Sequence, residues 1–153
     1  MALTMDQNNI HNFTWIPLFL IGLGAVGLGL GWLIHPEPWM LDQPPNEALL
    51  QTSFHALFAD EINAHLPDYL SVIYRFFGWW VMSIGLLTMT YIQVTKMGTA
   101  LARNSILGVF LIILIGIAYM VFSFIPLSPF KIVLYLQSAM WLTSAYFSTQ
   151  LQD

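Results

Sequence analysis

The side chains whose spacing suits metal or acid–base chemistry lie in one polar segment of an otherwise apolar chain. Glu61 and His65 are four residues apart, so they share a face if the segment is one continuous helix. Such a pair can bind a divalent cation if His35 or Glu37 folds over it. It can equally form a neutral hydrogen-bonded pair, or the helix can end before it. Zinc motifs fix three ligands at defined spacings. This segment has no set of three ligands at such spacings, so we predict no metal site.

One basic residue borders a long apolar stretch. Arg75 stands in the sequence YLSVIYRFFGWW. An arginine at such a position extends to the membrane surface, contacts an anion or a lipid headgroup, or pairs with an acid. The acids near enough in sequence are Glu61 and Asp68. These three residues form our candidate ion-pair or anion site.

The residue inventory offers no other catalytic chemistry. The absence of cysteine excludes disulfides, thiolate metal sites and a cysteine nucleophile. No histidine or acid lies within the long apolar stretches, which argues against haem and against a proton relay. Four Lys and Arg residues, against eight acids, cannot form a phosphate-binding surface, so nucleic acid is not an expected partner. We predict no catalytic residue and no cofactor; a bound lipid or quinone is compatible with this composition.

The elements that position these residues are membrane helices. The chain has 153 residues, of which 58% are hydrophobic and 8% charged, and its mean hydropathy is +0.70. Soluble domains carry about 25% charged residues. A spanning helix needs about 20 mostly apolar residues. Four segments meet this requirement, at about 13–34, 72–95, 105–125 and 132–151. We therefore predict an all-α integral membrane four-helix bundle that forms a single domain over residues 1–153.

The distribution of charge predicts the orientation of the bundle. The connection over residues 35–71 has no Lys or Arg and six of the eight acids, whereas Lys96 and Arg103 flank the short connection between the second and third spans. Basic residues favour the cytoplasmic side. We expect residues 35–71 to lie outside and both termini to be cytoplasmic, in a bacterial inner membrane.

The outer connection is expected to contain one extra helix. After a proline-rich start, apolar residues recur at helical spacing, which predicts an amphipathic helix at about 46–66, ended by Pro67. Its acids make it too polar to span a bilayer. We expect it to lie on the membrane surface or to cap the bundle. The apolar positions are Leu50, Phe54, Leu57 and Phe58.

The first span is rich in glycine. At 100° per residue one face carries Gly24, Gly27 and Gly31, and the nearly opposite face carries Gly22 and Gly29. Faces of small residues let helix backbones approach closely in lipid. The letters GLGAVG also match a dinucleotide-binding fingerprint, but that motif requires a strand followed by an open helix N-terminus. We predict that these five glycines are helix-packing positions, within the chain or against another subunit.

The last span carries a stripe of polar and aromatic residues on one face. Hydrogen bonding to a neighbouring helix is the usual role of such a stripe. The alternative is a groove for a quinone or a lipid, to which tryptophans of the second span contribute. The stripe consists of Gln137, Trp141, Ser144 and Ser148. The candidate groove consists of Trp79, Trp80, Gln137 and Trp141, with Arg75 at its mouth.

The layout resembles the DoxX-like group of small four-helix bacterial membrane proteins. The similar stretches are GLGLGWLIHPEP, a glycine-rich first span that ends near prolines, and YRFFGWWVMSIGLL, where an arginine and then a glycine open the second span. Arg75 and Gly78 are the corresponding positions. The resemblance implies a four-helix membrane fold and an association with a quinone-linked oxidoreductase. It carries over no catalytic residue.

Two functions from different classes follow from these features. The first is a non-catalytic accessory or assembly subunit of a larger inner-membrane complex, which packs through the glycine-rich span and the outer amphipathic helix. The alternative is a DoxX-like oxidoreductase component that binds a quinone or another apolar molecule between helices. The expected partners are the lipid bilayer and other membrane subunits or a second copy of the chain.

Overall fold

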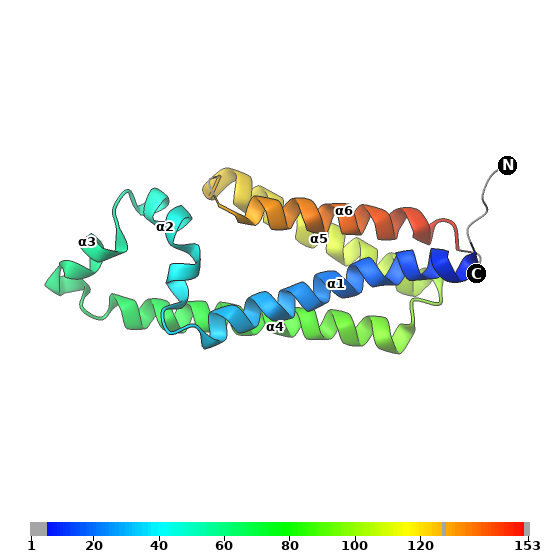
Figure 1. Cartoon of the computed structure of the whole chain (residues 1–153), viewed down its shortest axis with the longest axis horizontal. Helices are drawn as coiled ribbons and strands as arrows, with labels where there is room; N and C mark the ends of the chain where they lie inside the picture. The colour runs from blue at the N-terminus through cyan, green and yellow to red at the C-terminus, as the bar shows by residue number, and fades with distance from the viewer. Residues whose placement is uncertain (1–5, 127, 152–153) are drawn as a thin grey trace.

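The fold is an elongated bundle of long helices with a smaller helical segment at one end (Figure 1). A computed structural model describes residues 6–126 and 128–151, and within these residues the chain is all-α, without strands. Residues 38–63 project from the end of the bundle, and we call them the cap. The elements are α1 (Gln7–Ile34), η1 (Pro38–Asp42), α2 (Gln43–Leu50), α3 (Phe54–Ala59), η2 (Glu61–Asn63), α4 (Leu66–Thr95), α5 (Ala100–Phe124) and α6 (Phe130–Ser148), where η denotes a 3₁₀ helix.

In the described part of the chain, three helical segments are long and apolar enough to cross a membrane, and they indicate an integral membrane protein. They are α1, the segment that contains α4, and α5. The fourth predicted span corresponds to α6, which has 19 residues. Lys131, Gln137 and several hydroxyl side chains lower its hydropathy, so α6 does not meet the same criterion and its passage through the bilayer stays a prediction.

The long helices begin earlier than the predicted spans. α1 begins at Gln7 and α4 at Leu66, because a helix continues beyond the hydrocarbon wherever its polar end reaches water. Pro67 was expected to end a helix. It stands instead in the first turn of α4, where a missing N–H has no intrahelical partner to lose. The expected cytoplasmic ends, residues 1–5 and 152–153, lie outside the described residues.

The single amphipathic helix predicted over 46–66 is not formed, and this prediction was wrong. α2 ends where Gln51 adopts a left-handed conformation with φ 55°. A new helix then starts at Phe54. Ser53 is its N-cap, and the Ser53 side chain accepts a hydrogen bond from the Ala56 N–H at 3.1 Å. Glu61 lies in the separate turn η2, and His65 precedes α4. The cap is therefore a chain of short helices.

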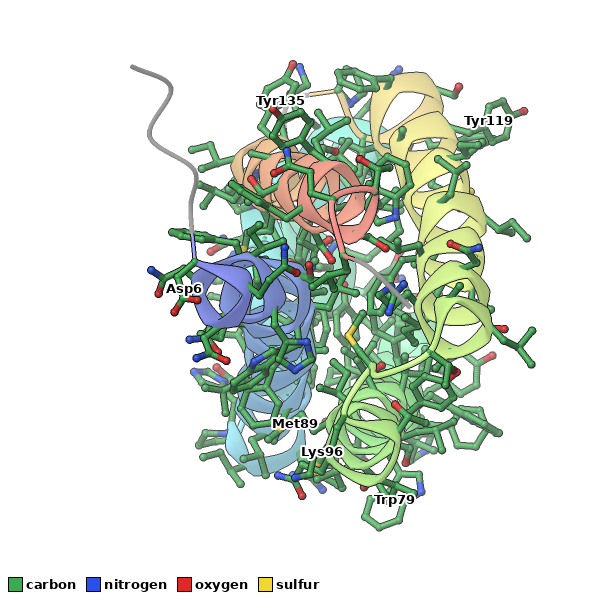
Figure 2. All side chains as sticks on the ribbon, turned by 90° about the vertical axis from the view of Figure 1, so that its right-hand side faces the viewer. Asp6, Trp79, Met89, Lys96, Tyr119 and Tyr135 are labelled. Carbon is green, nitrogen blue, oxygen red and sulfur yellow. The ribbon has the colours of Figure 1, made fainter. Side chains whose placement is uncertain are left out.

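α1 is the central helix of the bundle. It packs along α4 on one side and along α6 on another, and α5 packs on α6. Figure 2, a view along the bundle, shows the same pairing, with α4 beside α1 and α5 beside α6. The main buried cluster lies in the half of the bundle away from the cap. It consists of Leu18, Ile21, Ile92, Met97, Ile106, Leu107 and Phe110.

Four glycines bring α1 and α4 into backbone contact. A Cβ atom added at Gly29 would lie 2.5 Å from the carbonyl oxygen of Gly78, and one added at Gly85 would lie 2.5 Å from that of Gly22. The two glycines of each helix are seven residues apart, which is close to two helical turns, so both pairs fall on the same antiparallel seam. A Cβ atom at Gly29, Gly78 or Gly85 would come within 3.0 Å of backbone atoms of the other helix, so a larger residue there would force the helices apart.

The other predicted glycine face of α1 is open. A Cβ atom added at Gly24 or Gly27 would meet no atom within 4 Å, and one at Gly31 would lie 4.0 Å from a methyl of Leu41. The structure therefore uses Gly22 and Gly29 within the chain. It leaves Gly24 and Gly27 on the surface of the bundle.

Candidate functional site

The cap is tied to the bundle through η1 and α2. The side-chain amide of Asn46 in α2 donates a hydrogen bond to the Tyr74 hydroxyl of α4, with a separation of 2.6 Å. The same nitrogen lies 2.8 Å from the carbonyl oxygen of Asp42. Trp39 of η1 is buried. This end of the cap is thus held by a hydrogen bond to α4 and by the packing of η1 against α1 and α4.

Asp42 lies at the junction of the cap and the bundle. Its carboxyl group is half-buried, and burial raises its pKa above the ordinary value of 3.8, with a smaller opposing contribution from the indole of Trp32. A carboxyl group shielded from water keeps its proton to a higher pH because ionisation there costs solvation energy.

We expect Asp42→Asn to stabilise the folded protein more at neutral pH than in acid. Since the folded-state pKa lies above 3.8, the stability that this group contributes is fully present below pH 3.8 and is lost as pH rises through the raised pKa. Asparagine does not ionise, so the variant escapes this loss. Thermal unfolding in detergent at about pH 4 and about pH 7 measures the effect. A Tm difference between variant and wild type that is equal at both pH values would contradict it.

A second set of contacts gives the cap an internal structure. The Glu47 carboxylate accepts hydrogen bonds from the Gln43 side chain and from the Phe54 N–H, both at 2.9 Å. These bonds lower the pKa of Glu47 and join α2 to the start of α3. Phe54 stacks on Phe58 with a centroid separation of 5.4 Å, and Trp39 meets Phe58 edge-on at 6.0 Å.

The cap nevertheless leaves large apolar side chains uncovered. Leu49 is 60% exposed, Leu50 is 47% exposed and Ile62 is 88% exposed. Figure 1 shows that the cap extends past the connection between α5 and α6, beyond the end of the bundle. The exposed apolar side chains of the long helices lie on the surface that we expect lipid to cover. Those of the cap lie beyond the end of the bundle.

The candidate charged site is not assembled as an ion pair. Arg75, Glu61 and Asp68 are all exposed. Over residues 6–126 and 128–151, no carboxylate forms a salt bridge with Arg75. Arg75 lies on the exposed surface of α4, and its extension to the membrane surface stays a prediction.

The candidate metal ligands are not brought together either. Within the described part of the chain, no group of three His, Asp or Glu side chains could hold a metal ion. Glu61 lies in η2, and His65 lies in the turn that precedes α4. The His35 ring contacts the backbone of Glu37, at 2.8 Å from its carbonyl oxygen and 3.1 Å from its nitrogen.

The four residues of the candidate apolar groove separate into two places. Trp79 and Trp80 are each more than half exposed, and Figure 2 shows Trp79 pointing away from the bundle. Trp141 instead borders a groove between α5 and α6, which Gln137 does not line. The structure therefore does not join the two tryptophans of α4 to Trp141 of α6.

Two residues of the α6 stripe form hydrogen bonds between helices, as the stripe predicts. The Trp141 indole N–H donates to the carbonyl oxygen of Leu107 in α5 at 2.9 Å. The Ser144 hydroxyl donates to the carbonyl oxygen of Thr14 in α1. α6 is thereby fixed to both of its neighbours.

Comparison with known proteins gives no assignment. No protein family, curated protein or solved structure matches the chain. The resemblance to the DoxX-like group accordingly rests on two short sequence stretches.

Sequence reasoning missed two buried residues that organise the ends of the bundle. Arg103 is 4% exposed and donates from Nη1 to the carbonyl oxygen of Met97 at 3.3 Å. Trp32 is 2% exposed and packs against aromatic rings of α4 and α6. Arg103 was interpreted only as a charge that orients the loop. Its helical spacing from Leu107 and Phe110, which are both apolar, was the available indication that it lies on a buried face.

Proposed function

We propose that the chain is a non-catalytic accessory subunit of a larger inner-membrane complex and that it docks onto a neighbouring subunit through the cap. The observation that supports this most is the exposure of Ile62, Leu49 and Leu50 on a segment that projects from the bundle. Exposed apolar side chains that project from the bundle are typical of contacts with another protein or with the membrane surface.

The open glycine face of α1 supports a second contact within the membrane. Nothing lies within 4 Å of a Cβ atom built at Gly24 or Gly27. Small residues on a lipid-facing surface permit close approach of another helix. A partner that contacts the cap and also packs a helix against these glycines would cover both surfaces.

The composition of the long helices supports a role other than catalysis. Residues 13–34, 72–95 and 105–124 contain no Asp, Glu or His. Such residues form the proton and ion pathways of membrane proteins.

We also propose that the cap lies outside and the α4–α5 connection in the cytoplasm, since Lys96 and Arg103 are at that end.

One observation favours the alternative, a DoxX-like oxidoreductase component. Part of the groove between α5 and α6 is lined by Trp141, Leu107 and Leu111, and an apolar wall that includes an aromatic ring suits a quinone. Quinone extraction and redox difference spectra of the purified protein distinguish the two functions. An accessory subunit gives neither a bound quinone nor a redox spectrum.

Loss of one apolar side chain of the cap should weaken the complex. We expect Ile62→Ser to reduce recovery of partner subunits when the tagged protein is purified from its native membrane in mild detergent. Ile62 is 88% exposed, so nearly all of its side chain can contact a partner. Native mass spectrometry of the purified material measures the change.

The matched control is Ala64→Ser, a neighbouring exposed position that offers little apolar area. It should leave the composition of the complex unchanged. Recovery of a lone 17.4 kDa chain from wild-type membranes would contradict the proposed function, as would equal losses from both variants.

A further inference from the structure

We propose that the cap is covered by a basic protein surface, in which an apolar pocket takes Ile62 and Lys or Arg side chains around the pocket pair with Asp60 and Glu61. This partner chemistry rests on the docking function proposed above and adds to it the kind of surface that docks. It also commits to one occupant, because a protein and a membrane surface can both cover exposed apolar side chains.

The apolar contact lies at the far end of the cap. Asp60, Glu61 and Ile62 follow α3, the element farthest from the bundle in Figure 1. The exposure of Ile62, at 88%, is the largest of any large hydrophobic residue in the described part of the chain. No described element of the protein therefore covers this side chain.

The six acids of residues 35–71 fall into two groups. Two act within the fold, since Asp42 is half-buried and Glu47 accepts two hydrogen bonds. The other four are exposed, and over residues 6–126 and 128–151 their carboxylates form no hydrogen bond and no ion pair. This second group, which has no structural role inside the chain, consists of Glu37, Asp60, Glu61 and Asp68.

No base in the described part of the chain neutralises these four carboxylates. Residues 35–71 contain no Lys or Arg. Arg75 is exposed and forms no salt bridge with them. Lys131, in the first turn of α6, lies over the Phe122 ring, with its Nζ 5.8 Å from the ring centroid. The cap end of the protein is therefore acidic, and the surface that complements it is basic.

The same charge favours a protein over the membrane surface as the occupant. Anionic lipids attract Lys and Arg, and helical segments that lie on a membrane surface are rich in both. The cap has neither residue, and its free carboxylates are repelled by an anionic lipid surface. An apolar centre with charged side chains around it is instead the usual composition of a protein interface.

Recovery of the complex at two salt concentrations tests the partner chemistry. The tagged full chain is purified from its native membrane in mild detergent at about 0.05 M and about 0.5 M NaCl, a change that shortens the screening length about threefold. We expect recovery of partner subunits to fall about threefold or more at the higher concentration, because salt screens exposed ion pairs. Quantitative mass spectrometry of the purified material measures the change.

Removal of two charges gives the corresponding variant. Asp60→Asn combined with Glu61→Gln keeps the shape of both side chains, and at low salt it should lower partner recovery about threefold or more. Asp6→Asn is the matched control, since Asp6 and Asp60 are both exposed N-caps without a side-chain cap hydrogen bond. Asp6 lies at the opposite end of the bundle, so this variant should recover partners as the wild type does. All variants should keep the wild-type Tm.

A fluorescent label at position 62 tests the membrane surface as the other occupant. The chain has no cysteine, so Ile62→Cys provides a single labelling site. The labelled full chain is reconstituted alone into nanodiscs of phosphatidylglycerol and phosphatidylcholine that contain a lipid with a nitroxide quencher. We expect no quenching at position 62. The same label introduced by Leu87→Cys, on the exposed surface of α4, should be quenched.

The outcomes separate the partner chemistry from the docking function. A complex that resists both high salt and the double variant would overturn the basic partner surface and leave the accessory function standing. Equal quenching at positions 62 and 87 would overturn it in favour of the membrane surface. Recovery of a lone chain from wild-type membranes would overturn the docking function and the partner chemistry together.

Discussion

Replacing Gly29 by alanine should separate α1 from α4 and lower the free energy of unfolding by about 1–3 kcal/mol. The added Cβ atom would lie 2.5 Å from the Gly78 carbonyl oxygen and 2.6 Å from the Met82 nitrogen. Both contacts are backbone atoms, so no side-chain rotation relieves them and a helix has to move. Unfolding in mixed micelles with a rising fraction of denaturing detergent measures the loss.

Gly24→Ala is the matched control for this prediction. It makes the same change on the same helix, where nothing lies within 4 Å. Its stability should stay within about 0.5 kcal/mol of the wild type, as for surface substitutions generally. Equal losses in the two variants would show that the contact between α1 and α4 does not control the effect.

Trp32→Ala is expected to have the largest effect of any single substitution at the cap end of the bundle, about 3–5 kcal/mol. The ring is 2% exposed. Its centroid lies 4.9 Å from that of Phe77 on α4 and 5.9 Å from that of Phe130 on α6. Truncation leaves a cavity where three helices meet. It also removes the ring that lies beside Asp42, so the rate of backbone amide hydrogen exchange in η1 should increase.

The control for this substitution is Trp79→Ala. Trp79 is 56% exposed on the outer surface of α4, so its truncation opens no internal cavity. The loss of stability should be much smaller than for Trp32→Ala. Similar losses, or unchanged hydrogen exchange in η1 of the Trp32 variant, would contradict the position of Trp32 at the helix junction.

The long helices could be predicted because the bilayer imposes a simple requirement. Every backbone polar group in hydrocarbon must bond within the segment, so a long apolar run forms a helix. α1, α4 and α5 follow from this rule. α6 is less apolar than these three helices. Its stripe of polar side chains forms contacts with α1 and α5 and lowers its mean hydropathy.

The cap could not be predicted at the same level, because a backbone that can bond to water is not required to form one continuous helix. The apolar periodicity of residues 46–66 was real, and Phe54 is buried as that pattern predicts. The pattern did not reveal that Gln51 would turn left-handed and that Ser53 would cap a new helix. A cap serine within an apolar periodic segment was the sequence feature that indicated a break.

Tertiary packing decides which glycines and which charges matter, and a single sequence does not specify it. Both glycine faces of α1 are equally small. Only Gly22 and Gly29 meet glycines on α4, because the partner positions Gly85 and Gly78 lie in the matching register. Arg103 in turn lies on a face that contacts α6, so a charge expected in a loop is buried.

Site-specific photo-crosslinking at Ile62 in native membranes tests the central claim most directly. A photoreactive residue at this position, which is 88% exposed on the cap, should yield one discrete product with a different membrane protein. The same residue at Leu87 on the surface of α4, which is 70% exposed, should react with lipid and give no such product. A product from Ile62 that contains only a second copy of this chain, or no protein product at all, would contradict the role of an accessory subunit docked through the cap.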